Sequence, residues 1–334
     1  MIIVNNVQKT FKLPIVKEGR FAGIRSLFTR GYTEKIAVQN VNFTIEQGDF
    51  VGYIGPNGAG KSTTIKMLTG ILHPSAGEIT IHGLSPQRDR RQVVQRLGVV
   101  FGQRSQLWWD LPTKDTYDIL AAMYGIGEDV KKKRLGELSE LLGLDEFLTT
   151  PARKLSLGQR MRADLAAALL HDPDILFLDE PTIGLDVTAK KNIRGFLHTL
   201  NQDLGKTILL TTHDMDDIEQ LCKRVIVIES GRISYDGSID SLRDQIGLPT
   251  IMRVSFVGQV HVPKWTASEF PFEIKEYGSD YLMIHCNRQE IKPMDVLRIV
   301  SDWGEMDDVH LKEPDFEEII HRIQAQPVKK MLYA

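Results

Sequence analysis

The chain has 334 residues, of which 41 are basic and 44 acidic, so its formal net charge is −3. This length suits about two domains, and an apolar content of 42% excludes a disordered or low-complexity chain. The near-neutral charge argues against general attraction to nucleic acid or to an anionic membrane. Because Cys222 and Cys286 form no C-x-x-C pair, a disulfide framework and a cysteine-rich zinc site are excluded, and a reducing compartment is indicated.

The sequence contains no long apolar segment. The longest stretches without Asp, Glu, Lys or Arg have 11 residues, at 50–60 and 67–77, whereas a membrane-spanning helix needs about 20 apolar residues. The first residues also lack the charged region and apolar core of a secretory signal peptide. We therefore expect a cytoplasmic protein whose membrane role, if it has one, depends on a partner.

Hydrophobic patterning predicts strands that alternate with helices, which is typical of a parallel sheet with crossover helices. The expected strands are residues 1–11, 41–45, 50–54, 77–83, 97–101, 175–178, 207–211 and 225–228. The expected helices are residues 62–68, 112–124, 129–142, 158–170, 187–204 and 215–222.

A basic insertion interrupts this pattern at residues 12–35. It carries six basic residues against two acidic ones, and Phe21, Ile24, Leu27 and Phe28 recur at helical spacing. One interpretation is a surface helix whose apolar stripe packs on its own domain. The other is a basic amphipathic arm that contacts a membrane surface or a partner.

A change of composition near 238–249 predicts a second, C-terminal accessory domain at 241–334. Its hydrophobic pattern predicts an α+β fold, and its sequence contains no recognisable catalytic or ligand-binding motif. Its expected strands are 251–257, 272–277, 281–286 and one near Val309, and its expected helices are 293–303 and 315–324. Four histidines, His261, His285, His310 and His321, are too scattered to indicate a metal cluster.

A glycine-rich turn follows the strand at 50–54 and opens the helix at 62–68. Residues 55–63 read Gly-Pro-Asn-Gly-Ala-Gly-Lys-Ser-Thr and match G-x-x-x-x-G-K-[ST]. Glycines allow successive N–H groups to face one anion, and the helix N-terminus adds partial positive charge. The residues expected to bind phosphate are Gly55, Asn57, Gly58, Ala59, Gly60, Lys61, Ser62 and Thr63, with Ser62 also a ligand for Mg²⁺.

An acidic pair ends the buried strand at 175–178. Asp179 and Glu180 come at its carboxyl end, where ligands bind in open α/β sheets. We expect Asp179 to hold Mg²⁺ through water and Glu180 to act as general base on the attacking water.

With four further motifs, residues 1–240 resemble the nucleotide-binding subunit of ATP-binding cassette (ABC) transporters. Leu155-Ser-Leu-Gly-Gln159 is similar to the family signature LSGGQ, and Gln103 matches the Q-loop. Gly184-Leu-Asp186 matches the D-loop, and His213 matches the switch histidine. The resemblance implies a P-loop cassette with a parallel core sheet, an antiparallel β subdomain and a helical subdomain at about 104–171.

The resemblance also implies that two subunits pack head to tail around two ATP molecules. In each site one subunit would supply the phosphate loop and the other Ser156, Gly158 and Gln159 of the signature, while Asp186 would couple the two sites. Gln103 would contact Mg²⁺, and His213 would contact the γ-phosphate and align Glu180 with water. ATP would close the dimer and hydrolysis would reopen it.

The signature departs from the family pattern at Leu157, which replaces the first of two glycines. Its N–H survives and Gly158 keeps the position of close approach, so we expect the site to hydrolyse ATP. The presence of Glu180, the phosphate loop and a serviceable signature favours a homodimer, with a dimer of related ATPases as the alternative.

An aromatic residue after the first strand stacks on adenine in this family. Phe11 fits by its place after that strand, and Tyr32 fits by its spacing to Gly55. We prefer Phe11, although an aromatic residue beside a strand is often only part of the core.

The loop sequences resemble those of bacterial exporters of the drug, antibiotic or polysaccharide type. Such ATPases act on a separate membrane permease, which would hold this chain on the inner face of the membrane and contact it near residues 103–112. Trp108 and Trp109 in this segment suit an interface, and packing inside the helical subdomain is their alternative role. The alternatives for the whole protein are an importer ATPase and a soluble ABC ATPase that acts outside transport. We expect no nucleic-acid partner, since the chain has no global basic excess.

Overall fold

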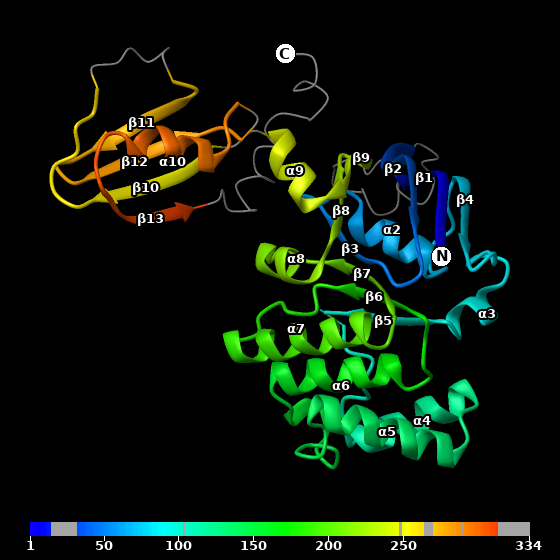
Figure 1. Ribbon diagram of the computed structural model, residues 1–334. Coiled ribbons are helices and arrows are strands. Elements are labelled where there is room, and N and C mark those ends of the chain that lie inside the picture. Colours follow the sequence, from blue (N-terminus) through cyan, green and yellow to red (C-terminus); the bar gives the residue numbers. More distant parts are fainter. Residues whose placement is uncertain (15–31, 103, 247–248, 264–269, 289, 313–334) are drawn as a thin grey trace, which may run out of the picture. The chain divides into compact units, whose positions relative to one another are not determined.

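The computed structural model describes residues 1–14, 32–102, 104–246, 249–263, 270–288 and 290–312 (Figure 1). The chain divides into two compact units, Met1–Asp236 and Gly237–Ala334. This division falls a few residues before the domain boundary at 240 that the composition predicts.

The first unit is built on a six-stranded sheet with the order β5-β6-β7-β3-β8-β9. Its strands are β3 (Phe50–Ile54), β5 (Leu97–Phe101), β6 (Ile175–Asp179), β7 (Thr207–Thr211), β8 (Arg224–Glu229) and β9 (Arg232–Ser238). The pairs β5–β6, β6–β7, β7–β3 and β3–β8 are parallel. β3 and β7 are buried at every position, as their unbroken apolar runs predict for strands covered on both faces.

A three-stranded antiparallel sheet with the order β2-β1-β4 lies in the same unit. It consists of β1 (Ile2–Pro14), β2 (Tyr32–Ile45) and β4 (Ala76–Ile81). Both strands extend beyond their predicted ends into the predicted insertion at 12–35, where Lys12 of β1 pairs with Glu34 of β2. The amphipathic helix predicted within 12–35 lies at residues outside those described.

The helices of the first unit differ from the predicted bounds mostly by one or two residues. They are α2 (Lys61–Leu68), α3 (Arg90–Val94), α4 (Thr113–Tyr124), α5 (Glu128–Leu142), the 3₁₀ turn η1 (Ala152–Lys154), α6 (Leu157–Leu169), α7 (Val187–Gln202) and α8 (Met215–Leu221). α4 and α5 both pack on α6 (Figure 1). In the described ranges no helix is both long and apolar enough to cross a membrane.

The second unit contains an antiparallel sheet with the order β11-β12-β10-β13. Its elements are α9 (Ile239–Ile246), β10 (Thr250–Phe256), β11 (Phe272–Tyr277), β12 (Tyr281–Cys286), α10 (Pro293–Ser301) and β13 (Met306–Lys312). Met252, Val254 and Leu282 from the sheet form its core with Val296 and Val300 from α10. This strand order is that of a split β-α-β arrangement. The predicted helix at 315–324 lies outside the described residues.

Several predicted site residues follow the carboxyl ends of neighbouring parallel strands. The glycine-rich turn follows β3, Asp179 ends β6, and Thr211 ends β7, which lies between β3 and β6. Because parallel strands end at the same edge of a sheet, the topology gathers these segments there.

Candidate active site

The phosphate loop joins β3 to α2, and its glycines are required by the backbone. A Cβ atom on Gly55 would lie 2.1 Å from the carbonyl oxygen of Ile228. Gly60 has φ +114°, and its Cβ would lie 2.6 Å from the oxygen of Ala37. α2 then begins without a side-chain cap and with no acidic residue in its first turn. Its first N–H groups therefore remain open to an anion.

Lys61 is buried at the start of α2. Its Nζ donates hydrogen bonds to the carbonyl oxygens of Gly55 and Pro56, at 2.5 and 3.1 Å. Burial lowers the pKa of the ammonium group, and the negative charges of Glu180 and Asp179 partly oppose this. Lys61 thus carries a desolvated charge beside the loop, where phosphate oxygens can replace the carbonyl partners.

The acidic pair is held by β7. Thr211 Oγ1 donates to Asp179 Oδ1 at 2.5 Å, and the N–H of Glu180 donates to the oxygen of Thr211 at 2.8 Å. Glu180 has φ +58°, a left-handed conformation that is unusual for a side chain of its size. Backbone held in this way is typical of functional sites.

His213 contacts Glu180 directly. Its Nε2 lies 2.6 Å from Glu180 Oε1, and the side chains of His213 and Glu180 are 47% and 16% exposed. The structure therefore brings together the two residues predicted as switch and general base, within hydrogen-bonding distance.

Two cavities open beside the loop. One of about 320 Å³ is lined by Ser62, Lys66, Ile71, Phe101, Gly102, Arg104, Asp179 and Glu180. One of about 410 Å³ is lined by Phe11, Leu13, Lys35, Ile36, Ala37, Asn57, Gly58, Gly60, Lys61, Ser62, Thr63 and Glu180. Both volumes are typical of small-ligand sites. Lys66, Arg104 and Lys35 are cationic lining residues that the sequence motifs do not identify.

The residues in the first cavity fit Mg²⁺. Ser62 and Asp179 both line it, and they supply the hydroxyl and carboxylate oxygens that this ion prefers. In the described part of the chain, no group of three or more His, Cys, Asp and Glu residues could hold a metal by itself. An ion there would complete its shell with water and substrate phosphates, as Mg²⁺ commonly does.

Gln103, the third predicted ligand, lies outside the described residues. Its neighbours turn tightly: the N–H of Arg104 donates to the oxygen of Phe101 at 2.9 Å, and the N–H of Gly102 donates to the oxygen of Asp179 at 2.7 Å. This part of the chain is therefore attached to the end of β6.

Of the two aromatic residues considered for adenine, Phe11 lines the larger cavity. Lys9 Nζ lies 5.3 Å from the centre of its ring. Tyr32 is 57% exposed and pairs with Pro14 where the described hairpin ends. The geometry favours Phe11, whose assignment stays a prediction.

The signature begins α6 with reciprocal hydrogen bonds. The N–H of Gln159 donates to Ser156 Oγ at 3.2 Å, and the N–H of Ser156 donates to Gln159 Oε1 at 3.0 Å. The side chain of Leu157 lies against Gly184. A Cβ atom added to Gly184 would be 3.0 Å from Leu157 Cδ2. Leu157, the residue that departs from the family signature, therefore contacts the D-loop of the same chain.

Asp186 ends the D-loop and caps α7, accepting from the N–H of Ala189 at 2.8 Å. Among the described residues that line the two cavities, none comes from the signature or is Asp186. One chain thus assembles the phosphate loop with Asp179, Glu180 and His213, but not with Ser156, Gly158, Gln159 or Asp186.

The segment after Gln103 is attached to α6. Ser105 Oγ and the N–H of Gln106 both donate to Asp164 Oδ1, at 3.0 and 2.9 Å. Burial raises the pKa of Asp164 to about 6, although these hydrogen bonds and the charge of Arg160 oppose the rise. Trp108 and Trp109 are exposed by 40% and 54%, so neither side chain belongs to the buried core of the helical subdomain.

A phosphate loop, an acidic strand end and a facing histidine on a parallel sheet define a P-loop nucleotide-binding protein. The family model described as ABC transporter matches residues 38–183. The chain is 38% identical over 206 residues to the ABC transporter ATP-binding protein NatA of Bacillus subtilis, covering 62% of this chain and 83% of NatA. It therefore belongs to the ABC transporter family, as one of its ATP-binding proteins.

Other relatives and solved structures agree. The Nod factor export ATP-binding protein I of Burkholderia pseudomallei is 40% identical, over 62% of this chain and 67% of that protein. The ATP-binding subunit of an ABC transporter superposes with a TM-score of 0.62 at 26% identity, over 74% of this chain and 93% of that chain. A dimeric post-hydrolysis cassette bound to ADP and Pi gives 0.60 at 27% identity, over 72% and 99%. The predicted cassette fold is thus confirmed.

Proposed function

We propose that this protein is the ATP-hydrolysing, energy-coupling subunit of a membrane transporter that exports its substrate. The observation that carries the hydrolytic part is the 2.6 Å contact between His213 and Glu180, beside the phosphate loop. Export is favoured because one relative is named for Nod factor export. ATP and Mg²⁺ are the substrate and ion implied.

In the proposed reaction the phosphates of ATP lie against residues 55–63, with Lys61 on the β and γ phosphates. Ser62 and Asp179, with Gln103, would hold Mg²⁺, which would neutralise charge on the phosphates. Glu180 takes a proton from water, whose oxygen bonds to the γ phosphorus as the bond to the bridging oxygen of ADP breaks. His213 orients Glu180 and the γ-phosphate.

We further propose that two copies complete each other's sites head to tail. The support is geometric: Ser156, Gly158 and Gln159 begin a helix, yet they do not line the phosphate cavities among the described residues. A second copy would bring this helix N-terminus to the γ-phosphate. A related ATPase could replace that copy, because the interface would use the same residues.

The proposed permease contact is the segment from Gln103 to Pro112, which carries exposed Trp108 and Trp109. This contact would hold the chain on the inner face of the membrane. The second unit would serve as an accessory or regulatory domain. An importer ATPase and a soluble ABC ATPase are the competing functions.

Two experiments test the proposal. Purified protein should release phosphate in the presence of Mg²⁺ and ATP, and Glu180→Gln should stop release while it traps an ATP-bound dimer, visible by light scattering. Glu140→Gln, a change at an exposed position on α5, is the matched control. A monomeric Glu180→Gln variant under saturating ATP would contradict the shared site.

Detergent extraction from the native cells tests the transport part. A multi-spanning hydrophobic protein should co-purify, and Trp109→Ala should weaken its recovery. Transport direction in sealed vesicles distinguishes export from import. Recovery with ribosomes or nucleic acid alone would support the soluble alternative.

A further inference from the structure

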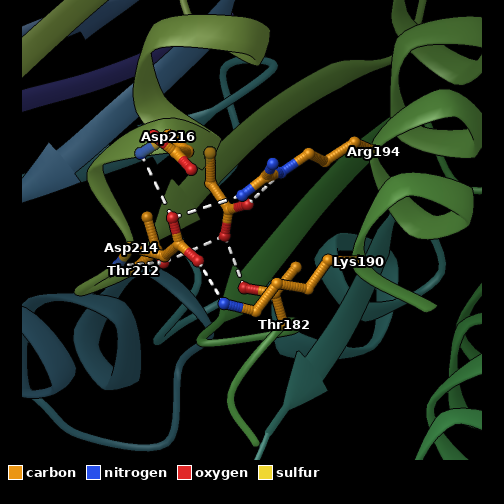
Figure 2. Close-up of polar contacts among 7 residues, drawn as sticks. Thr182, Lys190, Arg194, Thr212, Asp214 and Asp216 are labelled. Atoms are coloured by element: carbon orange, nitrogen blue, oxygen red, sulfur yellow. Dashed lines mark hydrogen bonds and ion pairs between the residues drawn. The ribbon is translucent and has the colours of Figure 1, made fainter. Parts of the chain in front are cut away.

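An ion cluster lies close to the catalytic pair and outside both cavities. We use this name for Lys190, Arg194, Asp214 and Asp217 with the hydroxyls of Thr182 and Thr212. Figure 2 draws its contacts, with Arg194 reaching from α7 towards the aspartates. None of its four charged residues belongs to a motif that the sequence predicts.

Arg194 joins the two carboxylates. Its Nε lies 2.5 Å from Asp217 Oδ1, and its terminal NH2 nitrogen lies 3.2 Å from Asp214 Oδ1 (Figure 2). The side chain of Asp217 is completely buried, and its Oδ2 accepts from Thr182 and from Thr212, the latter at 3.1 Å. A buried carboxylate with this many partners is tolerated only while they remain in place.

Asp214 is held from three sides. Lys190 and Arg194 form ion pairs with it, and the N–H of Asp216 donates to its Oδ1 at 3.1 Å. Burial tends to raise the pKa of Asp214, but the hydrogen bond from Lys190 and the charges of Lys190 and Arg194 outweigh it and lower the pKa. The N–H of Asp214 also donates to Thr212 Oγ1 at 2.9 Å.

The anchored residues flank the catalytic pair. Thr212 and Asp214 are the chain neighbours of His213, and Thr182 is two residues beyond Glu180. In the described part of the chain, Glu180 is the only recorded polar partner of His213. The position of the exposed imidazole is therefore set by its backbone, and the ion cluster holds that backbone on both sides.

We propose that Arg194 is a positioning residue for hydrolysis: by pairing with Asp214 and Asp217 it fixes the His213 turn against the segment that follows Glu180. The inference rests on the proposed ATPase function. It predicts that Arg194 governs the catalytic step and leaves ATP binding intact, because the phosphate loop contributes nothing to the ion cluster.

Kinetics provide the first test. Arg194→Gln should lower kcat for ATP hydrolysis about tenfold or more while the dissociation constant for ATP stays within about twofold. Arg194→Lys keeps the charge but cannot reach both carboxylates through one planar group, and it should recover part of kcat. If the glutamine variant does not fold, the lysine variant carries the test.

A double-mutant cycle with His213→Ala separates positioning from simple stability. If Arg194 acts through His213, Arg194→Gln should lower kcat no further in the His213→Ala background. Additive losses would overturn the proposal. The control is Arg224→Gln, which breaks a two-pronged pair with Asp236 at 2.7 and 2.8 Å. It should lower thermal stability and leave kcat unchanged.

Hydrogen exchange supplies a readout that does not need catalysis. Arg194→Gln should speed amide exchange in a peptide that spans 209–216, while peptides that span 55–63 keep their protection. Unchanged exchange at 209–216 would overturn the positioning role. A wild-type protein that hydrolyses no ATP would instead refute the proposed function, and the exchange result would still decide the positioning claim.

Discussion

Two helix N-termini in this chain are expected to contact phosphate, and they are built differently. α2 begins at Lys61 after Gly60, with no side-chain cap. α6 begins after Ser156, whose side chain and that of Gln159 form a complete capping box. One terminus leaves its N–H groups open within its own chain, whereas the other satisfies some of them internally.

The difference indicates two separate tasks. The terminus of α2, with Lys61 already desolvated beside it, has the geometry of an anion site within a single copy. The terminus of α6 is a stable helix start that keeps its shape without phosphate. This suits a surface that meets nucleotide only when a second copy arrives, as we propose. The predictions below test this contrast, from the largest expected effect to the smallest.

Lys61→Ala should weaken ATP binding by about 100-fold or more, because two charge-assisted contacts to phosphate are lost. Titration calorimetry measures this directly. Lys114→Ala, on the exposed side of α4, is the control and should bind ATP normally. Retained affinity in Lys61→Ala would mean that α2 is not the phosphate site.

Asp164→Asn should change the pH dependence of stability. The folded pKa of about 6 lies above the unfolded value of about 3.9. The folded state therefore binds this proton more tightly. Its stabilising effect is complete below about pH 4 and is lost as the pH rises through about 6.

Since asparagine does not titrate, the stability of Asp164→Asn relative to wild type should rise between pH 4 and pH 7, by at most about 3 kcal/mol. Urea unfolding at several pH values measures the trend. A difference independent of pH would show that Asp164 does not hold its proton in the fold.

Gly60→Ala should destabilise the fold by about 1–3 kcal/mol and abolish ATP binding. The new Cβ would lie 2.6 Å from a carbonyl oxygen, at φ +114°. Gly158→Ala is the matched change in the signature, where the nearest atom, Ala189 Cβ, lies 3.3 Å away. It should alter stability by less than about 1 kcal/mol. Thermal unfolding measures the stability of both variants. Equal losses of stability would contradict the proposed difference between the N-termini of α2 and α6.

Ser156→Ala should cost about 1 kcal/mol of stability, as the loss of a helix cap usually does. Gln159→Ala removes the other half of the capping box and should have a similar effect. Neither change should alter ATP affinity in the monomer, because neither residue lines the phosphate cavities among the described residues. Weaker ATP binding by monomeric Ser156→Ala would indicate that one chain completes the site alone.

The fold was largely predictable where apolar runs are continuous or strictly periodic. The strand at 207–211 and the helices α4 and α6 were predicted from such runs. Four short elements were not predicted: α3, η1, β9 and α9. α3 has five residues, too few to display a helical period, and β9 has a largely polar sequence with one buried residue. These elements are stabilised by contacts with neighbouring elements, and the local sequence pattern contains no information about such contacts.

The long hairpin was underestimated for a related reason. Residues 32–36 of β2 are exposed, so they lack the alternation that identifies a half-buried strand. Pairing with β1 supplies their backbone hydrogen bonds instead. Hydrophobic patterning in this hairpin therefore predicts which strand residues are buried, but it does not predict how far the two strands pair.

The sequence by itself determined the chemistry of the site. A phosphate-binding turn demands glycines and a lysine at fixed spacing, so the roles of Gly60 and Lys61 could be predicted from residue types. Asp179 and Glu180 were predicted from their place at the end of a buried strand, after such a turn in the chain. The tertiary structure decided which distant groups face one another. Arg194 meets Asp217 across 23 positions of the chain, because packing of α7 beside α8 brings them together. Contacts of this kind depend on the three-dimensional path of the chain, which no local spacing encodes.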